Sequence, residues 1–81
     1  MVLSDQERSA LQDAYKLSPR EVDILSLLVE GVDTSARLGE ALGISPHTAK
    51  VVLTHIYLKM GENSKLAVAM KAVDTILPLR A

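Results

Sequence analysis

The hydrophobic positions of the chain recur every three or four residues, the period of an α-helix, in segments separated by Gly, Pro and Ser. No stretch shows the sustained alternation of apolar and polar residues that marks a half-buried strand. Near the C-terminus, apolar side chains at helical spacing predict a stripe buried in the core. The members of that predicted stripe are Leu66, Ala69, Met70, Val73, Ile76 and Leu77. The pattern predicts an all-α fold.

Start and stop signals divide this pattern into five predicted helices. Glu7 follows Ser4, and Glu21 follows Ser18, at the spacing of a capping box. In that motif two side chains satisfy unpaired N–H groups at a helix start. Glycines and a proline supply the stops, because glycine readily adopts the left-handed turn that ends a helix and proline cannot continue one. The predicted helices cover about residues 5–15, 19–30, 35–42, 46–60 and 64–76.

The helix predicted at 46–60 has two different faces, because each residue advances by about 100° around the axis. Its expected core face consists of Ala49, Val52, Leu53, Ile56 and Met60. Lys50, Val51 and Thr54 project from the opposite side, with His47 and Leu58 close to them. Their amine, methyl and hydroxyl groups match the acceptors and thymine methyls that line the major groove of DNA. A merely solvated outer face is the alternative interpretation.

A short helix and a turn precede this segment. The helix predicted at 35–42 ends at Gly43, and the next helix begins at once with the Ser45-Pro46 start signal. A short helix, a turn and a longer helix form a helix-turn-helix, in which the second helix enters the groove and the first braces it. The succession therefore favours DNA binding through residues 46–60.

Composition is typical of a small intracellular protein. The 81 residues suffice for one domain, and 48% of them are apolar, mostly Leu, Val, Ala and Ile. The absence of cysteine excludes a disulfide framework and agrees with the reducing cytoplasm. No apolar run approaches the roughly 20 residues that span a bilayer. We therefore expect a soluble cytoplasmic protein with no membrane partner.

Charge is distributed unevenly along the chain. Residues 1–43 carry eight acidic and four basic side chains, a net charge of −4, whereas residues 44–81 carry five basic and two acidic ones, a net charge of +3. A polyanion, if one is bound, would therefore meet the C-terminal half. A chance distribution over a near-neutral surface is the alternative.

Three stretches together resemble a known family. "LSPREVDILSLLVEG", "LGEALGISPHTAKVVLTHIYLKMG" and "NSKLAVAMKAV" follow one another in the order found in the LuxR-type (GerE-type) helix-turn-helix DNA-binding domain of bacterial transcription regulators. The resemblance implies a compact four-helix domain at residues 17–81 that binds DNA as a dimer. Residues 1–16 are then an N-terminal helical extension, a short additional helix that we expect to pack Leu11 and Tyr15 on the domain.

The resemblance also implies roles for individual residues. By position in the motif, the base-reading residues are Lys50, Val51 and Thr54. Ser45, Thr48 and Lys59 match positions that commonly meet the phosphate backbone, and the basic His47, His55 and Lys65 are added as further candidates for DNA contact. The family's C-terminal helix commonly makes the dimer contact, which would fall here on Val68, Ala72 and Thr75.

These expectations define a transcription regulator whose partners are double-stranded DNA, a second copy of the chain and, as a further candidate, RNA polymerase. The alternative is a protein–protein interaction module, such as an anti-activator or an RNA-polymerase adaptor, which the acidic N-terminal half favours. His47 and His55 lack a nearby Cys or carboxylate that would complete a metal site. The small core leaves little room for a substrate pocket. No metal, cofactor or enzymatic activity is therefore predicted.

Overall fold

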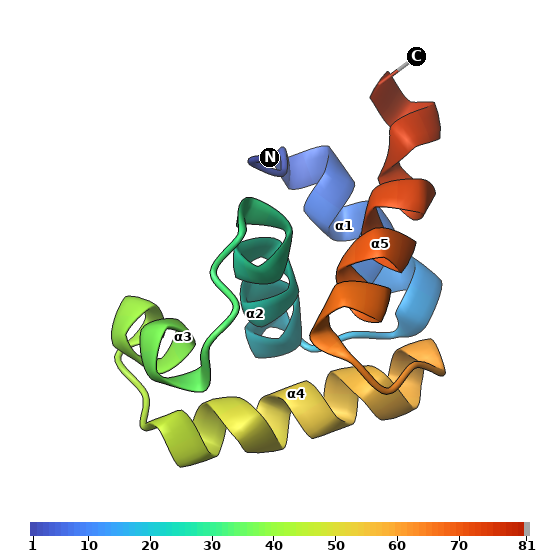
Figure 1. Cartoon of the computed structure of the whole chain (residues 1–81). Coiled ribbons are helices and arrows are strands. Elements are labelled where there is room, and N and C mark those ends of the chain that lie inside the picture. The colour runs from blue at the N-terminus through green and yellow to red at the C-terminus, as the bar shows by residue number, and fades with distance from the viewer. Residues whose placement is uncertain (81) are drawn as a thin grey trace.

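The computed structural model describes residues 1–80, and these residues form helices without a strand (Figure 1). The elements are α1 (Asp5–Tyr15), α2 (Pro19–Glu30), α3 (Ser35–Leu42), α4 (Pro46–Met60), α5 (Lys65–Ile76) and a terminal 3-10 helix, η1 (Leu77–Arg80). The all-α prediction is confirmed, and the predicted helix limits agree to within one residue. In the part of the chain that is described, no helix is both long and apolar enough to cross a lipid bilayer.

Side-chain caps explain why the helices begin where they do. At the start of each α-helix, a hydroxyl oxygen accepts a hydrogen bond from the backbone N–H three residues ahead. The capping residues are Ser4, Ser18, Thr34, Ser45 and Ser64. Both predicted capping boxes are closed, because the Glu7 and Glu21 carboxylates each accept the N–H of their capping serine at 2.8 Å.

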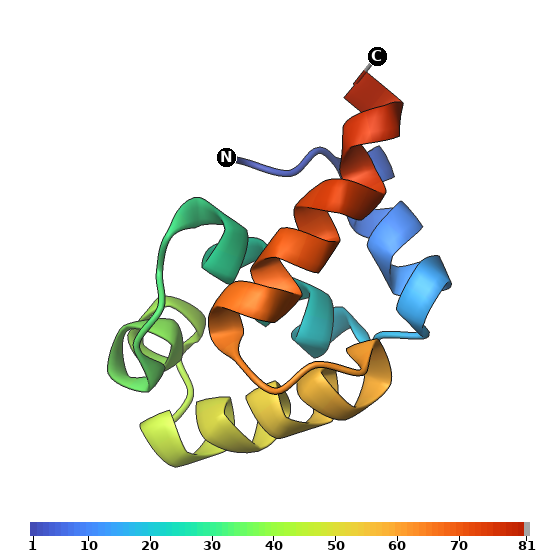
Figure 2. The same ribbon diagram turned by 45° about the vertical axis from the view of Figure 1, so that its right-hand side comes forward.

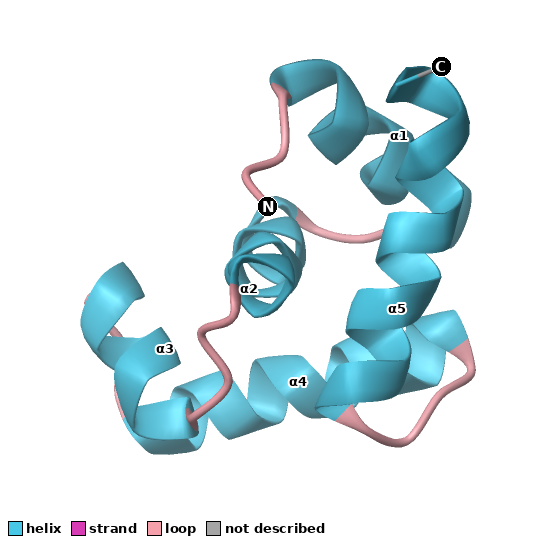
Figure 3. Ribbon diagram, turned by 45° about the horizontal axis from the view of Figure 1, so that its top comes forward, coloured by secondary structure: helices cyan, strands magenta, loops and turns pink. Residues whose placement is uncertain are grey.

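The helices surround one core, and α4 lies along an edge of the molecule (Figures 1 and 3). α2 packs against both α4 and α5, whereas α3 packs against α4 and α1 packs against α5 and α2. The largest completely buried side chains come from all five α-helices: Leu11, Ile24, Leu25, Leu38, Ile56, Val68 and Ile76. The N-terminal extension therefore belongs to the same core as the rest of the chain.

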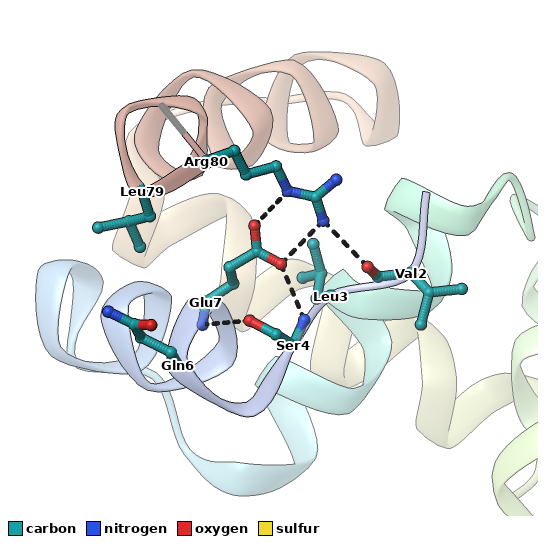
Figure 4. Close-up of a pocket in the computed structure, with 7 residues that line it drawn as sticks. All are labelled: Val2, Leu3, Ser4, Gln6, Glu7, Leu79 and Arg80. Atoms are coloured by element: carbon teal, nitrogen blue, oxygen red, sulfur yellow. Dashed lines mark hydrogen bonds and ion pairs between the residues drawn. The ribbon is translucent and has the colours of Figure 1, made fainter.

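The two ends of the chain are joined by an ion pair (Figure 4). The Arg80 guanidinium pairs with Glu7 through both carboxylate oxygens, one of them at 2.8 Å from Nη2, and Nη2 also donates to the Val2 carbonyl at 3.0 Å. The hydrogen bond from Arg80, with that from the Ser4 N–H, lowers the pKa of Glu7 from 4.5 to about 2. The start of α1 is thus held against η1.

The predicted core stripe of α5 is wrong for several of its members. Leu66 and Met70 are 69% and 58% exposed, and Leu77 is also exposed, whereas Val68 and Ala72 are completely buried. α5 carries two apolar strips, and the strip with the smaller side chains faces α1 and α2, where they allow close packing. Helical periodicity does not decide between two apolar strips of one helix.

Candidate nucleic-acid interface

The turn between α3 and α4 is fixed by a close backbone approach. The Ile44 N–H donates to the Gly39 carbonyl at 2.9 Å, and Gly43 ends α3 in the left-handed conformation with φ +69°. A Cβ atom on Gly39 would lie only 2.4 Å from the Ile44 carbonyl oxygen. Glycine at this position therefore lets α3 lie directly on the turn that leads into α4.

The inner face of α4 anchors the helix to the core as predicted. Ala49, Leu53, Ile56 and Met60 are buried, and Val52 is half-buried at the edge of this face. These side chains pack on α2, α3 and α5. The orientation of α4 around its own axis is thereby set.

The outer face of α4 is uncovered. Lys50, Val51 and Thr54 are exposed, as are His47 and the strongly protruding Leu58, which is 76% exposed. Figures 1 and 2 show α4 at the margin of the molecule, with the other helices on one side of it. The sequence of α4 contains two lysines, two histidines and no acidic residue. This outer face can therefore approach a polyanion without a carboxylate of its own helix in the way.

The hydroxyl groups around α4 are partly committed to local bonds. Thr54 Oγ1 donates to the Lys50 carbonyl at 3.1 Å, so this hydroxyl can only accept a hydrogen bond from a base. Ser45 Oγ accepts the Thr48 N–H at 3.1 Å and donates to Thr48 Oγ1 at 3.0 Å. Because Thr48 is the acceptor in that pair, its own hydroxyl hydrogen can be donated to an outside oxygen.

Lys59, predicted to contact phosphate, is already paired inside the protein. Its ammonium donates to Glu21 Oε1 at 2.7 Å and to the Lys16 carbonyl at 3.1 Å. His55 Nδ1 lies 3.9 Å from the other oxygen of Glu21, while its ring remains largely exposed. The structure therefore pairs Lys59, whose side chain is 39% exposed, with a buried carboxylate and places His55 at the border of the outer face.

The Glu21 carboxylate is charged although it is buried. Burial alone would raise the pKa of Glu21, but the hydrogen bonds from Lys59 and from the Ser18 N–H, with the Lys59 charge, outweigh it and hold the pKa below its ordinary value. The capping-box spacing pointed to Glu21 as a local helix cap only. Its contact with α4 joins residues 38 positions apart, which no local spacing reveals.

The end of α4 is held by Lys71, a second residue that the sequence did not single out. Its ammonium donates to the Met60 carbonyl at 2.6 Å and lies 3.6 Å from Glu62. A cation at this place satisfies a carbonyl that the helix leaves unpaired at its C-terminus. Both ends of α4 are thus tied down, at the α3 turn and at α5.

Two sequence-based assignments are changed by the structure. Val68 and Ala72 are completely buried and Thr75 is bonded to Tyr15, so the strip predicted for dimer contact lies inside the domain. Lys65, which lies on α5, lines a hollow together with Leu28, Gly31, Asp33, Leu66 and Ala69. The other predicted DNA-contact residues are brought together on or beside α4.

Among residues 1–80, no three His, Cys, Asp or Glu side chains gather as a metal site.

Comparison with known families assigns this architecture. Residues 15–72 match the family described as "Bacterial regulatory proteins, luxR family", and the matched region includes the whole helix-turn-helix of α3 and α4. No curated protein and no solved structure matches the chain. The family match covers well over half of the 81 residues. The chain therefore belongs to the luxR family of bacterial regulatory proteins and carries the helix-turn-helix DNA-binding domain of that family.

Proposed function

We propose that the protein is a sequence-specific transcription regulator that places α4 in the major groove of DNA. The observation that carries this proposal is the uncovered outer face of α4, the second helix of a helix-turn-helix, which holds basic groups and no acidic ones. Its 15 residues correspond to a helix of about 22 Å. A helix of these dimensions fits a groove about 12 Å wide.

In this arrangement Lys50, Val51 and Thr54 read the bases. The Lys50 ammonium donates to the O6 and N7 acceptors of guanine, and the methyl groups of Val51 contact a thymine methyl. The Thr54 hydroxyl accepts from an exocyclic amino group, because its hydrogen is bonded to the Lys50 carbonyl. All three side chains are exposed on the same face of α4.

Phosphate contacts flank this reading surface. The first turn of α4 presents the N–H of His47 and the hydroxyl of Thr48, because Pro46 has no N–H and the Thr48 N–H is bonded to the capping serine. Helix N-termini favour anions. His47 and His55 lie beside it and add donors for phosphate oxygens. Ser45 contributes by capping the helix and orienting Thr48 rather than by a free hydroxyl hydrogen.

The regulator acts as a dimer through the outer apolar strip of α5, in which Leu66 and Met70 are exposed and Ala69 and Val73 are half-buried. Leu66, Ala69, Met70 and Val73 form this strip at helical spacing, beside a hollow that Leu28 and Val29 of α2 also line. Two such strips on two copies can bury each other around a twofold axis. A dimer would read two half-sites in the cytoplasm of a bacterial cell, where RNA polymerase is a further candidate partner.

Selection of duplexes from a random DNA pool, followed by binding measurements over a range of salt concentrations, tests the proposal. We expect an enriched sequence and a binding constant whose logarithm falls linearly with the logarithm of the salt concentration. Binding without sequence preference would contradict base reading. The second candidate, a protein–protein interaction module, is favoured by the exposed Val51 and Leu58 on the same face. It predicts no salt-dependent duplex binding.

A further inference from the structure

The buried carboxylate of Glu21 is hydrogen-bonded to a side chain of α4. It lies in the first turn of α2, and its Oε1 accepts both the Ser18 N–H at 2.8 Å and the Lys59 ammonium at 2.7 Å. Lys59 also donates to the carbonyl of Lys16, the residue that caps the C-terminal end of α1. One lysine of α4 is thus bonded to two separate backbone segments, through Glu21 and through Lys16.

These bonds have a direction, unlike the apolar contacts around them. Hydrophobic packing between α2 and α4 decides which face of α4 is buried, but it is non-directional and fixes the tilt of the helix less sharply than an oriented bond does. Charge-assisted hydrogen bonds are short and oriented, so they fix the position of the atoms that they join. The Lys59 ammonium therefore fixes the C-terminal half of α4 relative to α2, while the bond from Lys71 to the Met60 carbonyl holds the last turn against α5.

The position of that half affects the base-reading residues. Without the Lys59 bonds, α4 would tilt about its N-terminal end. Lys50 and Thr54 lie about 6 Å and 12 Å from the start of the helix, so a tilt of about 5° would move them by about 0.5 Å and 1 Å. Functional contacts of this kind require placement within about 0.5 Å. The other end of α4 is already fixed by the approach of Gly39 to Ile44.

We propose that Glu21 is a positioning residue for DNA reading, which holds Lys59 and thereby sets the angle at which α4 meets the bases. This inference rests on the proposed function, and it assigns Glu21 no contact with DNA. Lys59 acts in the same unit, as the partner of Glu21 rather than as an independent phosphate contact. The persistence of charge on Glu21 supports it, since its pKa is held below the ordinary value.

The molecule contains a matched control for this carboxylate. Glu7 occupies the same third position of a capping box, is equally buried and pairs with Arg80, but it joins the chain ends (Figure 4). Glu7→Gln and Glu21→Gln therefore remove the same kind of interaction at two places. Only the second place is in contact with α4.

The test compares the affinity of the full chain for the duplex that the wild-type protein selects and for a scrambled duplex of equal length. The measurement is made at a temperature at which circular dichroism shows each variant folded. Glu21→Gln should lower the ratio of the two affinities by about tenfold, the discrimination carried by one base contact. Its affinity for the scrambled duplex should stay the same, and Glu7→Gln should leave the ratio unchanged.

If Glu21→Gln does not fold, Lys59→Gln provides a second measurement of the affinity ratio, because Lys59 is the more exposed partner of the ion pair and its loss should disturb the fold less. It should lower the ratio as Glu21→Gln does and leave the salt dependence of binding unchanged, and Lys59→Arg should restore the ratio. An unchanged ratio with a salt slope smaller by about one would make Lys59 a phosphate contact and overturn the proposal. Equal losses of discrimination in Glu7→Gln and Glu21→Gln would overturn it too. A wild-type protein without sequence preference would instead refute the proposed function, and this inference with it.

Discussion

Tyr15 and Thr75 meet through their hydroxyl groups, 2.7 Å apart, across 60 positions of the chain. Thr75 gives its hydrogen to the Lys71 carbonyl at 2.9 Å, so Tyr15 is the donor in this pair. The bond attaches the end of α1 to the last turn of α5. It thereby covers the side of α5 that the sequence had assigned to a dimer contact, and it makes α1 a part of the domain.

Tyr15→Phe should lower the free energy of unfolding by about 1 kcal/mol, the usual net contribution of a hydrogen bond between half-buried groups. Urea unfolding followed by circular dichroism measures the change. Thr75→Val and the double variant complete a cycle that isolates the contribution of the pair. Strictly additive losses in this cycle would show that the two hydroxyl groups do not interact in solution.

Met70→Glu should leave the fold intact and abolish dimerisation, because Met70 stands in the middle of the outer apolar strip of α5 and a carboxylate there would face its own copy across a twofold axis. Sedimentation equilibrium measures the association. Leu79→Glu adds the same charge at an exposed apolar residue near the chain ends and should leave the dimer unchanged. A persistent dimer in Met70→Glu would exclude this strip as the interface.

Ala72→Glu, by contrast, should unfold the domain, since that side chain is completely buried.

The helix limits could be predicted because their signals are local. A serine followed by a glutamate three residues later, or a glycine after an apolar run, defines a helix end without reference to the rest of the chain. The buried face of α4 was equally readable, because most of its apolar residues fall in a single arc with Lys50 and Thr54 opposite, and only Val51 and Leu58 lie outside that arc on the exposed side. For these features, sequence spacing and tertiary packing demand the same arrangement.

The remaining features depend on which elements meet in space. Both strips of α5 are apolar, and the packing of α1 and α2 against one of them decides that Ala72 is buried and Met70 exposed. The pairing of Lys59 with Glu21 joins residues that only the crossing of α2 and α4 brings together. The lysine that the sequence assigned to phosphate is therefore also the partner of a buried carboxylate in the structure, with its own side chain 39% exposed.

Lys50→Ala should reduce affinity for the selected duplex by about 1–3 kcal/mol and relax the preference at one base pair, because a lysine donating to guanine carries that much discrimination. Fluorescence anisotropy with single-base variants of the duplex measures both effects. Lys65→Ala removes the same charge from the hollow beside Asp33 and should change affinity far less. An equal loss on every duplex would assign Lys50 to the phosphate backbone instead.

Gly39→Ala should destabilise the domain by about 1–3 kcal/mol, although alanine is the better helix former, because its methyl group would collide with a backbone carbonyl that cannot turn away. Chemical denaturation gives the value. Ala41→Gly, at an exposed position of the same helix, should lower the free energy of unfolding by about 1 kcal/mol. This control measures the effect of helix propensity without a steric collision. A stabilising effect of Gly39→Ala would mean that α3 and the turn lie farther apart in solution.

Acid should weaken the fold through Glu7. The pKa of this carboxyl is about 2 in the folded chain, against an ordinary value of 4.5 that we assign to the unfolded chain. Between these pH values Glu7 is protonated in the unfolded state but still charged in the folded state. The free energy of unfolding that Glu7 contributes above about pH 4.5 is therefore lost as the pH falls toward 2. Urea unfolding at a series of pH values should show this loss, and Glu7→Gln should flatten the acid limb of the curve. Arg80→Gln should flatten it as well, because the Arg80 guanidinium is the main cause of the lowered pKa. An acid limb that stays equally steep in both variants would mean that the pairing of the chain ends does not persist in solution.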